Sequence, residues 1–101
     1  MEQPLTAKAD FNTMAATFKG LSDPSRLHLL AILLEGETNV NDLAAQCGLS
    51  PSATSHQLRV LRNLRFVSAR RDGQQVYYRI NDEHIQDLME QAYKHSLHLN
   101  L

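Results

Sequence analysis

Near its middle, the chain ends one helix and begins another within a few residues, and this spacing constrains the fold more than any other feature. Apolar residues recur at helical spacing from Val40 to Cys47, and Gly48 is a residue type that commonly ends a helix. Ser50 then supplies a cap and Pro51 a first-turn proline for the next helix. Two helices joined by so tight a turn indicate a helix-turn-helix.

Two helical patterns precede this pair. Apolar residues within 11–18 recur at i, i+3, i+4 and i+7, and Gly20 is expected to end that helix. Asp23 and Pro24 then begin a helix that runs to Glu35 and is apolar nearly all round, so we expect it to be the central buried helix. Its expected core face consists of Leu27, Leu30, Ala31 and Leu34.

A hairpin and a last helix follow the pair. The runs 66–71 and 76–80 are rich in β-branched and aromatic residues, and Asp72-Gly73 between them is a strong hairpin signal. Asn81 or Asp82 is expected to cap the last helix. The predicted fold class is mainly α with a β-hairpin, a winged helix-turn-helix. The expected core stripe of the last helix consists of Ile85, Leu88, Met89, Ala92, Ser96 and Leu99.

The composition points to one small domain and excludes several classes of protein. The 101 residues are 43% hydrophobic and include no Trp, so the core is moderate in size and we expect oligomerisation. The longest apolar run, 29–34, is far shorter than the roughly 18 residues of a membrane span, and the first ten residues do not resemble a secretion signal. We therefore expect a cytoplasmic protein. Cys47 is the single cysteine, which excludes an intrachain disulfide.

Positive charge is concentrated in the middle third of the chain. The formal net charge is −1, yet residues 50–80 carry six arginines against one aspartate. The segments before and after have more acidic than basic side chains. The basic excess therefore coincides with the second helix of the pair and the hairpin, which are the elements that a winged helix-turn-helix lays on duplex DNA.

The helix 50–64 has one arc that is polar throughout, and we expect that arc to face DNA. Hydroxyl, imidazole and guanidinium groups can contact base edges and phosphates from the major groove. Arg62 and Asn63 are interpreted as ordinary solvated side chains, and Gln57 as the partner of a buried or intersubunit polar group. The expected DNA-binding residues are Ser52, Ser55, His56 and Arg59 of the helix, with Arg70, Arg71 and Gln74 of the hairpin.

Two strings of residues resemble a known family. LSDPSRLHLLAILL (21–34) and DLAAQCGLSPSATSHQLRVLRNLRFVSARRDGQQVYYRI (42–80) are similar to the ArsR/SmtB family of bacterial metal-responsive repressors, and the resemblance covers almost the whole chain. The segments DPSRL and SHQLRVLRNLRFVSARRDGQQVYY are specific to that family. The resemblance implies a homodimer built on the first and last helices, which blocks transcription until an inducer releases it from its operator.

Three of the five histidines fall on one stripe of the last helix, because successive residues of a helix are about 100° apart around its axis. His84 and His95 are roughly 16.5 Å apart along the axis, whereas zinc–nitrogen bonds are about 2.0–2.1 Å. One helix therefore cannot close a metal site. If the helix pairs antiparallel with its symmetry mate, Asp82 and His84 of one chain meet His95 and His98 of the other, which gives two sites per dimer. This pattern resembles the last-helix zinc site of the family's zinc and cobalt sensors.

Four nitrogen and oxygen ligands without a thiolate suit Zn(II), with Co(II) as a substitute and Ni(II) as the rival metal. The cysteine pair of another branch of the family has no counterpart in 39–42, and we interpret Cys47 as a buried structural thiol. The sequence predicts a non-enzymatic repressor that binds a palindromic operator as an apo dimer. Zn(II) at the dimer interface releases it and derepresses metal efflux or sequestration genes.

Other functions remain open at this point. They are a Ni(II) or Co(II) sensor of the same fold, a winged-helix regulator without a metal response, a winged-helix module that binds another protein, and a metalloenzyme. Catalytic zinc sites usually keep an open coordination position, which four protein ligands would not leave. The expected partners are operator DNA and a second copy of the chain, with no membrane and no organic substrate. We expect a single domain over 1–101, with the helix-turn-helix at 39–64, the wing at 65–80, and the dimer and metal-sensing helix at 82–99.

Overall fold

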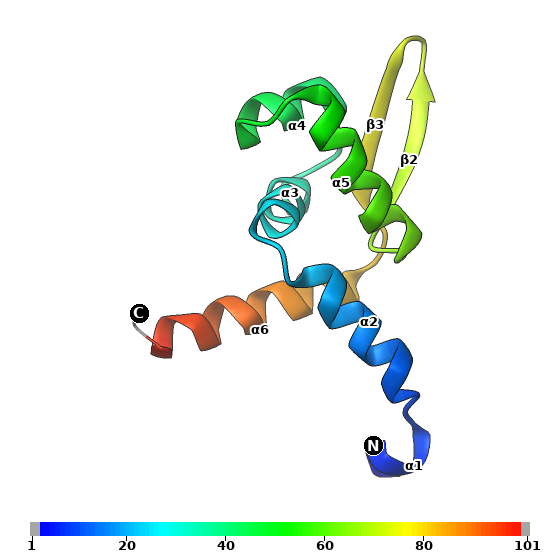
Figure 1. Cartoon of the computed structure of the whole chain (residues 1–101), viewed down its shortest axis with the longest axis vertical. Helices are drawn as coiled ribbons and strands as arrows, with labels where there is room; N and C mark the ends of the chain where they lie inside the picture. The colour runs from blue at the N-terminus through cyan, green and yellow to red at the C-terminus, as the bar shows by residue number, and fades with distance from the viewer. Residues whose placement is uncertain (1–2, 100–101) are drawn as a thin grey trace.

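The fold is mainly helical with a small antiparallel sheet, as predicted (Figure 1). The computed structural model describes residues 3–99. The sheet has the strand order β1-β3-β2. The elements are α1 (Leu5–Lys8), α2 (Phe11–Leu21), α3 (Pro24–Leu34), β1 (Thr38–Asn39), α4 (Val40–Cys47), α5 (Pro51–Asn63), β2 (Val67–Asp72), β3 (Gln75–Ile80) and α6 (Glu83–Leu99).

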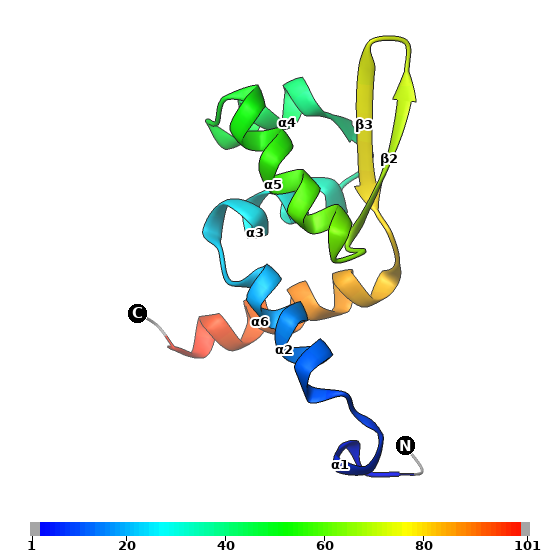
Figure 2. The same ribbon diagram turned by 45° about the vertical axis from the view of Figure 1, so that its right-hand side comes forward.

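The helices divide into two groups on either side of α3. Figures 1 and 2 show α4 and α5 on one side of α3, with α2 and α6 on the other. The β2–β3 hairpin lies beside α5 and extends beyond the helices in both views. The expected reading helix and wing are therefore neighbours at one end of the molecule.

The turn between α4 and α5 has the predicted chemistry. Gly48 has a φ of 68°, a left-handed conformation that costs glycine little. The amide of Leu49 donates to the carbonyl of Ala44 at 3.0 Å, which satisfies an acceptor at the end of α4. The hydroxyl of Ser50 then accepts from the amide of Ala53 at 3.0 Å and caps α5.

The hairpin has a two-residue turn, and its register sorts its side chains onto two faces. Asp72 pairs with Gln75, and Gly73 has a φ of 63° at the first turn position, where a type II′ turn needs glycine. Because successive side chains of a strand alternate between faces, Arg71 and its neighbour Arg70 lie on opposite sides of the sheet. The two arginines therefore have different surroundings.

The core lies between α3, the α4–α5 pair and the hairpin, and α3 presents a different face to it than predicted. Leu29, Leu30 and Leu33 are buried, whereas Leu27 and Leu34 are half-buried and Ala31 is exposed. A helix that is apolar nearly all round has too little periodicity to define its own buried face. Packing against α4, α5 and β3 decides it instead. The remaining buried hydrophobic residues of this core are Leu43, Leu58, Leu61, Phe66, Val67, Tyr78 and Ile85.

Gly20 does not end its helix, contrary to the prediction. Helix α2 continues to Leu21, and Gly20 is buried inside it. A Cβ at this position would meet the side chain of Leu64, next to Phe66. Glycine therefore allows α2 to approach the segment that follows α5.

The predicted core stripe of α6 is correct only for its first half. Ile85 is buried and Leu88 and Met89 are half-buried, but Ala92, Ser96 and Leu99 are exposed. The C-terminal half of α6 extends away from the core (Figure 1), and within residues 3–99 its large apolar side chains Tyr93, Leu97 and Leu99 stay exposed.

Asn81 forms a joint between the hairpin and α6. Its amide nitrogen Nδ2 donates to the carbonyl of Arg65 at 3.0 Å, and its Oδ1 accepts from the hydroxyl of Ser68 at 2.6 Å. Its backbone amide donates to the carbonyl of Phe66 at 3.0 Å. The chain is thus anchored to the base of the hairpin one residue before Asp82, where α6 is capped.

Candidate nucleic-acid interface and metal ligands

Helix α5 holds its predicted DNA-binding residues opposite a fully buried face. Thr54, Leu58 and Leu61 are buried against the core. On the polar side, Ser52, His56 and Arg59 are exposed and Ser55 is half-buried. Because its apolar side is fixed, α5 presents this polar face in one orientation.

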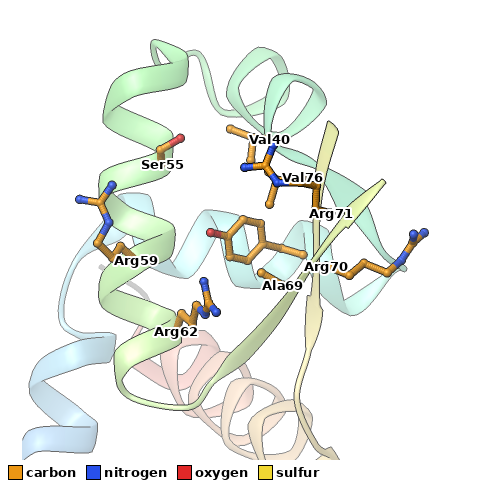
Figure 3. Close-up of a pocket in the computed structure, with 9 residues that line it drawn as sticks. Val40, Ser55, Arg59, Arg62, Ala69, Arg70, Arg71 and Val76 are labelled. Atoms are coloured by element: carbon orange, nitrogen blue, oxygen red, sulfur yellow. The ribbon is translucent and has the colours of Figure 1, made fainter. Parts of the chain in front are cut away.

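The hairpin brings Arg71 and Gln74 toward α5. Gln74 lies in the turn and lines a hollow of about 290 Å³ together with Ser52 and Ser55. Arg71 lines a second hollow, between α5 and the hairpin, and Figure 3 shows its side chain directed toward the helix. The structure therefore brings together residues from both elements that the sequence predicted.

Arg70 lies apart from the other predicted DNA-binding residues. Its guanidinium makes a bidentate contact with Glu37, at 3.0 Å from Nε to Oε2 and 2.7 Å from Nη2 to Oε1. It also lies 4.6 Å from the centre of the Tyr77 ring, and Figure 3 shows it directed away from α5. The hydrogen bond from Arg70 lowers the pKa of Glu37, and Glu37 in turn raises that of Arg70. This pair ties the outer face of the hairpin to the segment before β1.

Arg62 and Gln57 make contacts that the sequence alone left undefined. Arg62 lines the hollow between α5 and the hairpin, and Figure 3 shows its side chain directed into that space. Gln57 accepts a hydrogen bond from Arg26 at 3.0 Å, so its partner is a half-buried cation of α3. The position of Arg62 on the polar arc was the available signal, but which way its long side chain turns depends on the hairpin.

The four predicted metal ligands lie toward the two ends of α6. The carboxylate of Asp82 accepts from the backbone amide of His84 at 2.9 Å and lies 3.4 Å from Nδ1 of the same histidine. Both contacts use Oδ1, so Oδ2 can still serve as a ligand. The side chain of His84 is 79% exposed, and His95 and His98 are exposed near the far end of the helix.

Within residues 3–99 of a single chain, no three histidine, cysteine or acidic side chains come together in a group that could hold a metal ion. The donors of α6 nevertheless suit zinc chemically, because imidazole and carboxylate are both common zinc ligands. Burial raises the pKa of Cys47, which opposes the thiolate form that a metal would require.

Comparison with known proteins identifies the family. The sequence profile of the bacterial regulatory protein, arsR family, matches residues 23–69, which include α3, the helix-turn-helix and the start of the hairpin. The HTH-type transcriptional regulator NmtR of Mycobacterium tuberculosis is 46% identical over 88 residues, which are 87% of this chain and 73% of the relative. The chain belongs to the ArsR/SmtB family of transcriptional regulators.

Two further proteins extend this ArsR/SmtB assignment. A cadmium resistance transcriptional regulatory protein, a CadC homologue of Staphylococcus aureus, is 41% identical over 88% of this chain and 74% of its own length. The solved homodimeric winged helix-turn-helix DNA-binding domain of a possible ArsR-family regulator from Mycobacterium bovis has a TM-score of 0.79 and 28% identity, covering 95% of this chain and 87% of that one.

Family membership confirms several predictions. ArsR-family proteins are regulators rather than enzymes, and they bind DNA as homodimers. The fold class and the expected partners, duplex DNA and a second copy of the chain, therefore stand. Among residues 3–99, no helix combines the length and the apolar character that crossing a membrane requires.

Proposed function

We propose that this ArsR/SmtB-family chain is a metal-responsive repressor that binds operator DNA as an apo dimer and is released when Zn(II) binds at α6. The observation that carries the proposal is the donor set of α6, with Asp82 and His84 at its start and His95 and His98 near its end. A carboxylate and three imidazoles form a zinc ligand set, but these pairs are too far apart along one helix to share an ion.

A second chain would complete the set. The C-terminal half of α6 is exposed, including the hydrophobic residues Tyr93, Leu97 and Leu99. An antiparallel pair of α6 helices would cover these side chains and bring Asp82 and His84 of one protomer to His95 and His98 of the other. Two equivalent metal sites per dimer follow from the two-fold symmetry.

The DNA-binding part of the proposal uses the polar face of α5 and the hairpin. Ser52, Ser55, His56 and Arg59 would reach into the major groove, with Arg71 and Gln74 beside them. Arg70 would contribute through the position of the hairpin, because Glu37 already holds its guanidinium. Two such DNA-binding surfaces in a dimer would bind a near-palindromic operator, with half-sites about 34 Å apart or a multiple of that distance. A bacterial repressor of this kind works in the cytoplasm, where the chromosome lies.

The response requires two arrangements of the dimer that differ in metal affinity. Bound zinc would supply a bridge between the two chains. Metal binding can shift the DNA-binding equilibrium only by as much as the metal affinity of the α6 residues differs between those two arrangements. Coupling of this kind is typically about 1–3 kcal/mol, and by reciprocity DNA must weaken zinc binding by the same factor.

A single substitution in α6 tests the proposal. The variant His95→Ala should bind a promoter fragment as tightly as the parent chain but should not be released by Zn(II), since one ligand of each site is missing. Fluorescence anisotropy of the labelled fragment with and without Zn(II) measures both properties. Repeating the titration with Co(II) and Ni(II) identifies the metal that releases the repressor most effectively.

His28→Ala is the matched control, because His28 is an exposed histidine of α3 outside the proposed site. This variant should keep the full zinc response. A His95→Ala protein that zinc still releases from DNA would contradict the ligand assignment. If no metal releases the parent chain from DNA, the protein is a winged-helix regulator without a metal response.

A further inference from the structure

Helix α5 and the hairpin enclose a cavity of about 390 Å³, which Arg62 lines together with Ser55, Arg59 and Arg71 of the proposed DNA-binding residues. Its apolar lining comes from α4 and the inner face of the sheet. Figure 3 shows that Arg62 of α5 and Arg71 of β2 extend into it from opposite walls, with the hydroxyl of Ser55 directed into the same space. The apolar lining residues are Val40, Ala69, Val76 and Tyr78.

The cavity has cationic walls, and no acidic side chain lines it. The charged lining residues are all arginines. In the part of the chain that the structure describes, the ion pairs involve Arg70 and His84, and neither Arg62 nor Arg71 has an acidic partner. Two guanidinium groups that share a hollow repel each other unless an anion lies between them. The cavity is therefore suited to an anion with several oxygen acceptors.

The position of the cavity indicates which anion that is. If α5 enters the major groove and the hairpin lies along the neighbouring backbone or minor groove, the sugar-phosphate strand between the grooves must pass between these two elements. The space between them is the cavity. Arginine and serine side chains are common donors to DNA phosphates.

We propose that this cavity seats a phosphodiester group of the DNA backbone, held by Arg62 and Arg71 with the hydroxyl of Ser55 as a further donor. The proposal rests on the DNA-binding role proposed above for α5 and the hairpin. It gives Arg62 a role in fixing the register of the protein on the duplex. Because a phosphate contact carries no sequence information, this role is independent of which bases the operator contains.

The salt dependence of DNA binding tests the proposed phosphate contact. The slope of log Kobs against log salt is negative, and each lost phosphate contact reduces its magnitude by about 0.9. A dimer that loses one contact in each half should therefore have a slope that is smaller in magnitude by about 1.8. Arg62→Gln and Arg71→Gln should each show this decrease, equally on a promoter fragment and on an unrelated duplex. Arg62→Lys should restore most of the slope, because it keeps the charge.

The matched control is Arg79→Gln, which removes the same charge from the exposed outer side of the hairpin. It should leave the slope unchanged. If the slope decreases equally in all three glutamine variants, the effect is one of overall charge and the proposed phosphate contact is wrong. Unchanged slopes in Arg62→Gln and Arg71→Gln would also overturn it. Circular dichroism should show the same helical content for every variant.

Inorganic phosphate separates a DNA phosphate from a free phosphorylated ligand. Phosphate should perturb the Arg62 side-chain signal in an NMR titration only at millimolar concentration, and duplex DNA should displace the phosphate and shift the same signal at much lower concentration. Tight phosphate binding together with an unchanged slope in Arg62→Gln would assign the cavity to a free anion and overturn the proposal. The unrelated duplex needs neither operator nor metal, so loss of the zinc response would not affect this result. A parent chain without salt-dependent DNA binding would contradict the proposed function itself.

Discussion

Arg26 shows how a single side chain can connect three helices. From α3, its Nε donates to the carbonyl of Gly20 at 2.6 Å and its Nη2 to that of Lys19 at 3.3 Å, near the end of α2. Its Nη1 donates to Gln57 of α5 at 3.0 Å. The last carbonyls of a helix lack partners within the helix, so a cation placed there satisfies acceptors that burial would otherwise leave unpaired.

Replacing this arginine should therefore destabilise the fold. We expect Arg26→Gln to lower the free energy of unfolding by about 1–3 kcal/mol, because charged hydrogen bonds to half-buried acceptors are lost. Gln57→Ala should cost about 0.5–1.5 kcal/mol. Urea denaturation at one protein concentration measures both values, since unfolding of a dimer depends on concentration. Arg59→Ala, an exposed control, should stay within about 0.5 kcal/mol of the parent. An Arg26→Gln protein no less stable than this control would contradict the role of Arg26.

At the scale of elements, local chemistry predicted the structure where it was strong. Gly48, Ser50 and Pro51 define the α4–α5 turn, and Gly73 defines the hairpin turn. The short elements α1 and β1 were not predicted, because four and two residues are too few to show a period. β1 depends on pairing with Tyr77 and Tyr78 of β3, which is a tertiary contact. The cavity beside Arg62 was also beyond sequence reasoning, because it arises only when α5 and the hairpin come together.

The attachment of the hairpin to Glu37 should depend on pH. Because Arg70 lowers the pKa of Glu37, the attachment is complete above the ordinary glutamate pKa of about 4.3 and is lost as pH falls through the lowered value. The NMR signal of the Arg70 Nε–H group should therefore titrate in the parent chain and not in Glu37→Gln. Glu35→Gln, a neighbouring exposed carboxylate, should leave the titration intact. An Arg70 signal that is insensitive to acid in the parent chain would show that the pair does not persist in solution.

At the scale of the whole molecule, one chain leaves two apolar helix faces uncovered. Phe18 of α2 is 59% exposed and Leu97 of α6 is 61% exposed. These faces explain why the predicted α6 core stripe failed in its second half, since periodicity reports that a face is buried without saying by which chain.

A charge on either face should separate the proposed dimer. We expect Phe18→Asp and Leu97→Asp to sediment as monomers, because dimerisation would bury an unpaired carboxylate. Operator affinity should fall at least about tenfold, since one half-site replaces two. Gln46→Asp, on the exposed side of α4, is the sedimentation control and should remain dimeric. If both substituted proteins sediment as the parent does, the interface must lie elsewhere.

The joint at Asn81 has a mechanical consequence for the assembled protein. Its hydrogen bonds to Arg65, Phe66 and Ser68 connect the base of the hairpin to the start of α6. If α6 tilts against a partner chain, these hydrogen bonds favour movement of the hairpin together with α6. In the proposed dimer, the angle at which the two α6 helices cross would then set how far apart the two hairpins stand, and hence which groove spacing they can span.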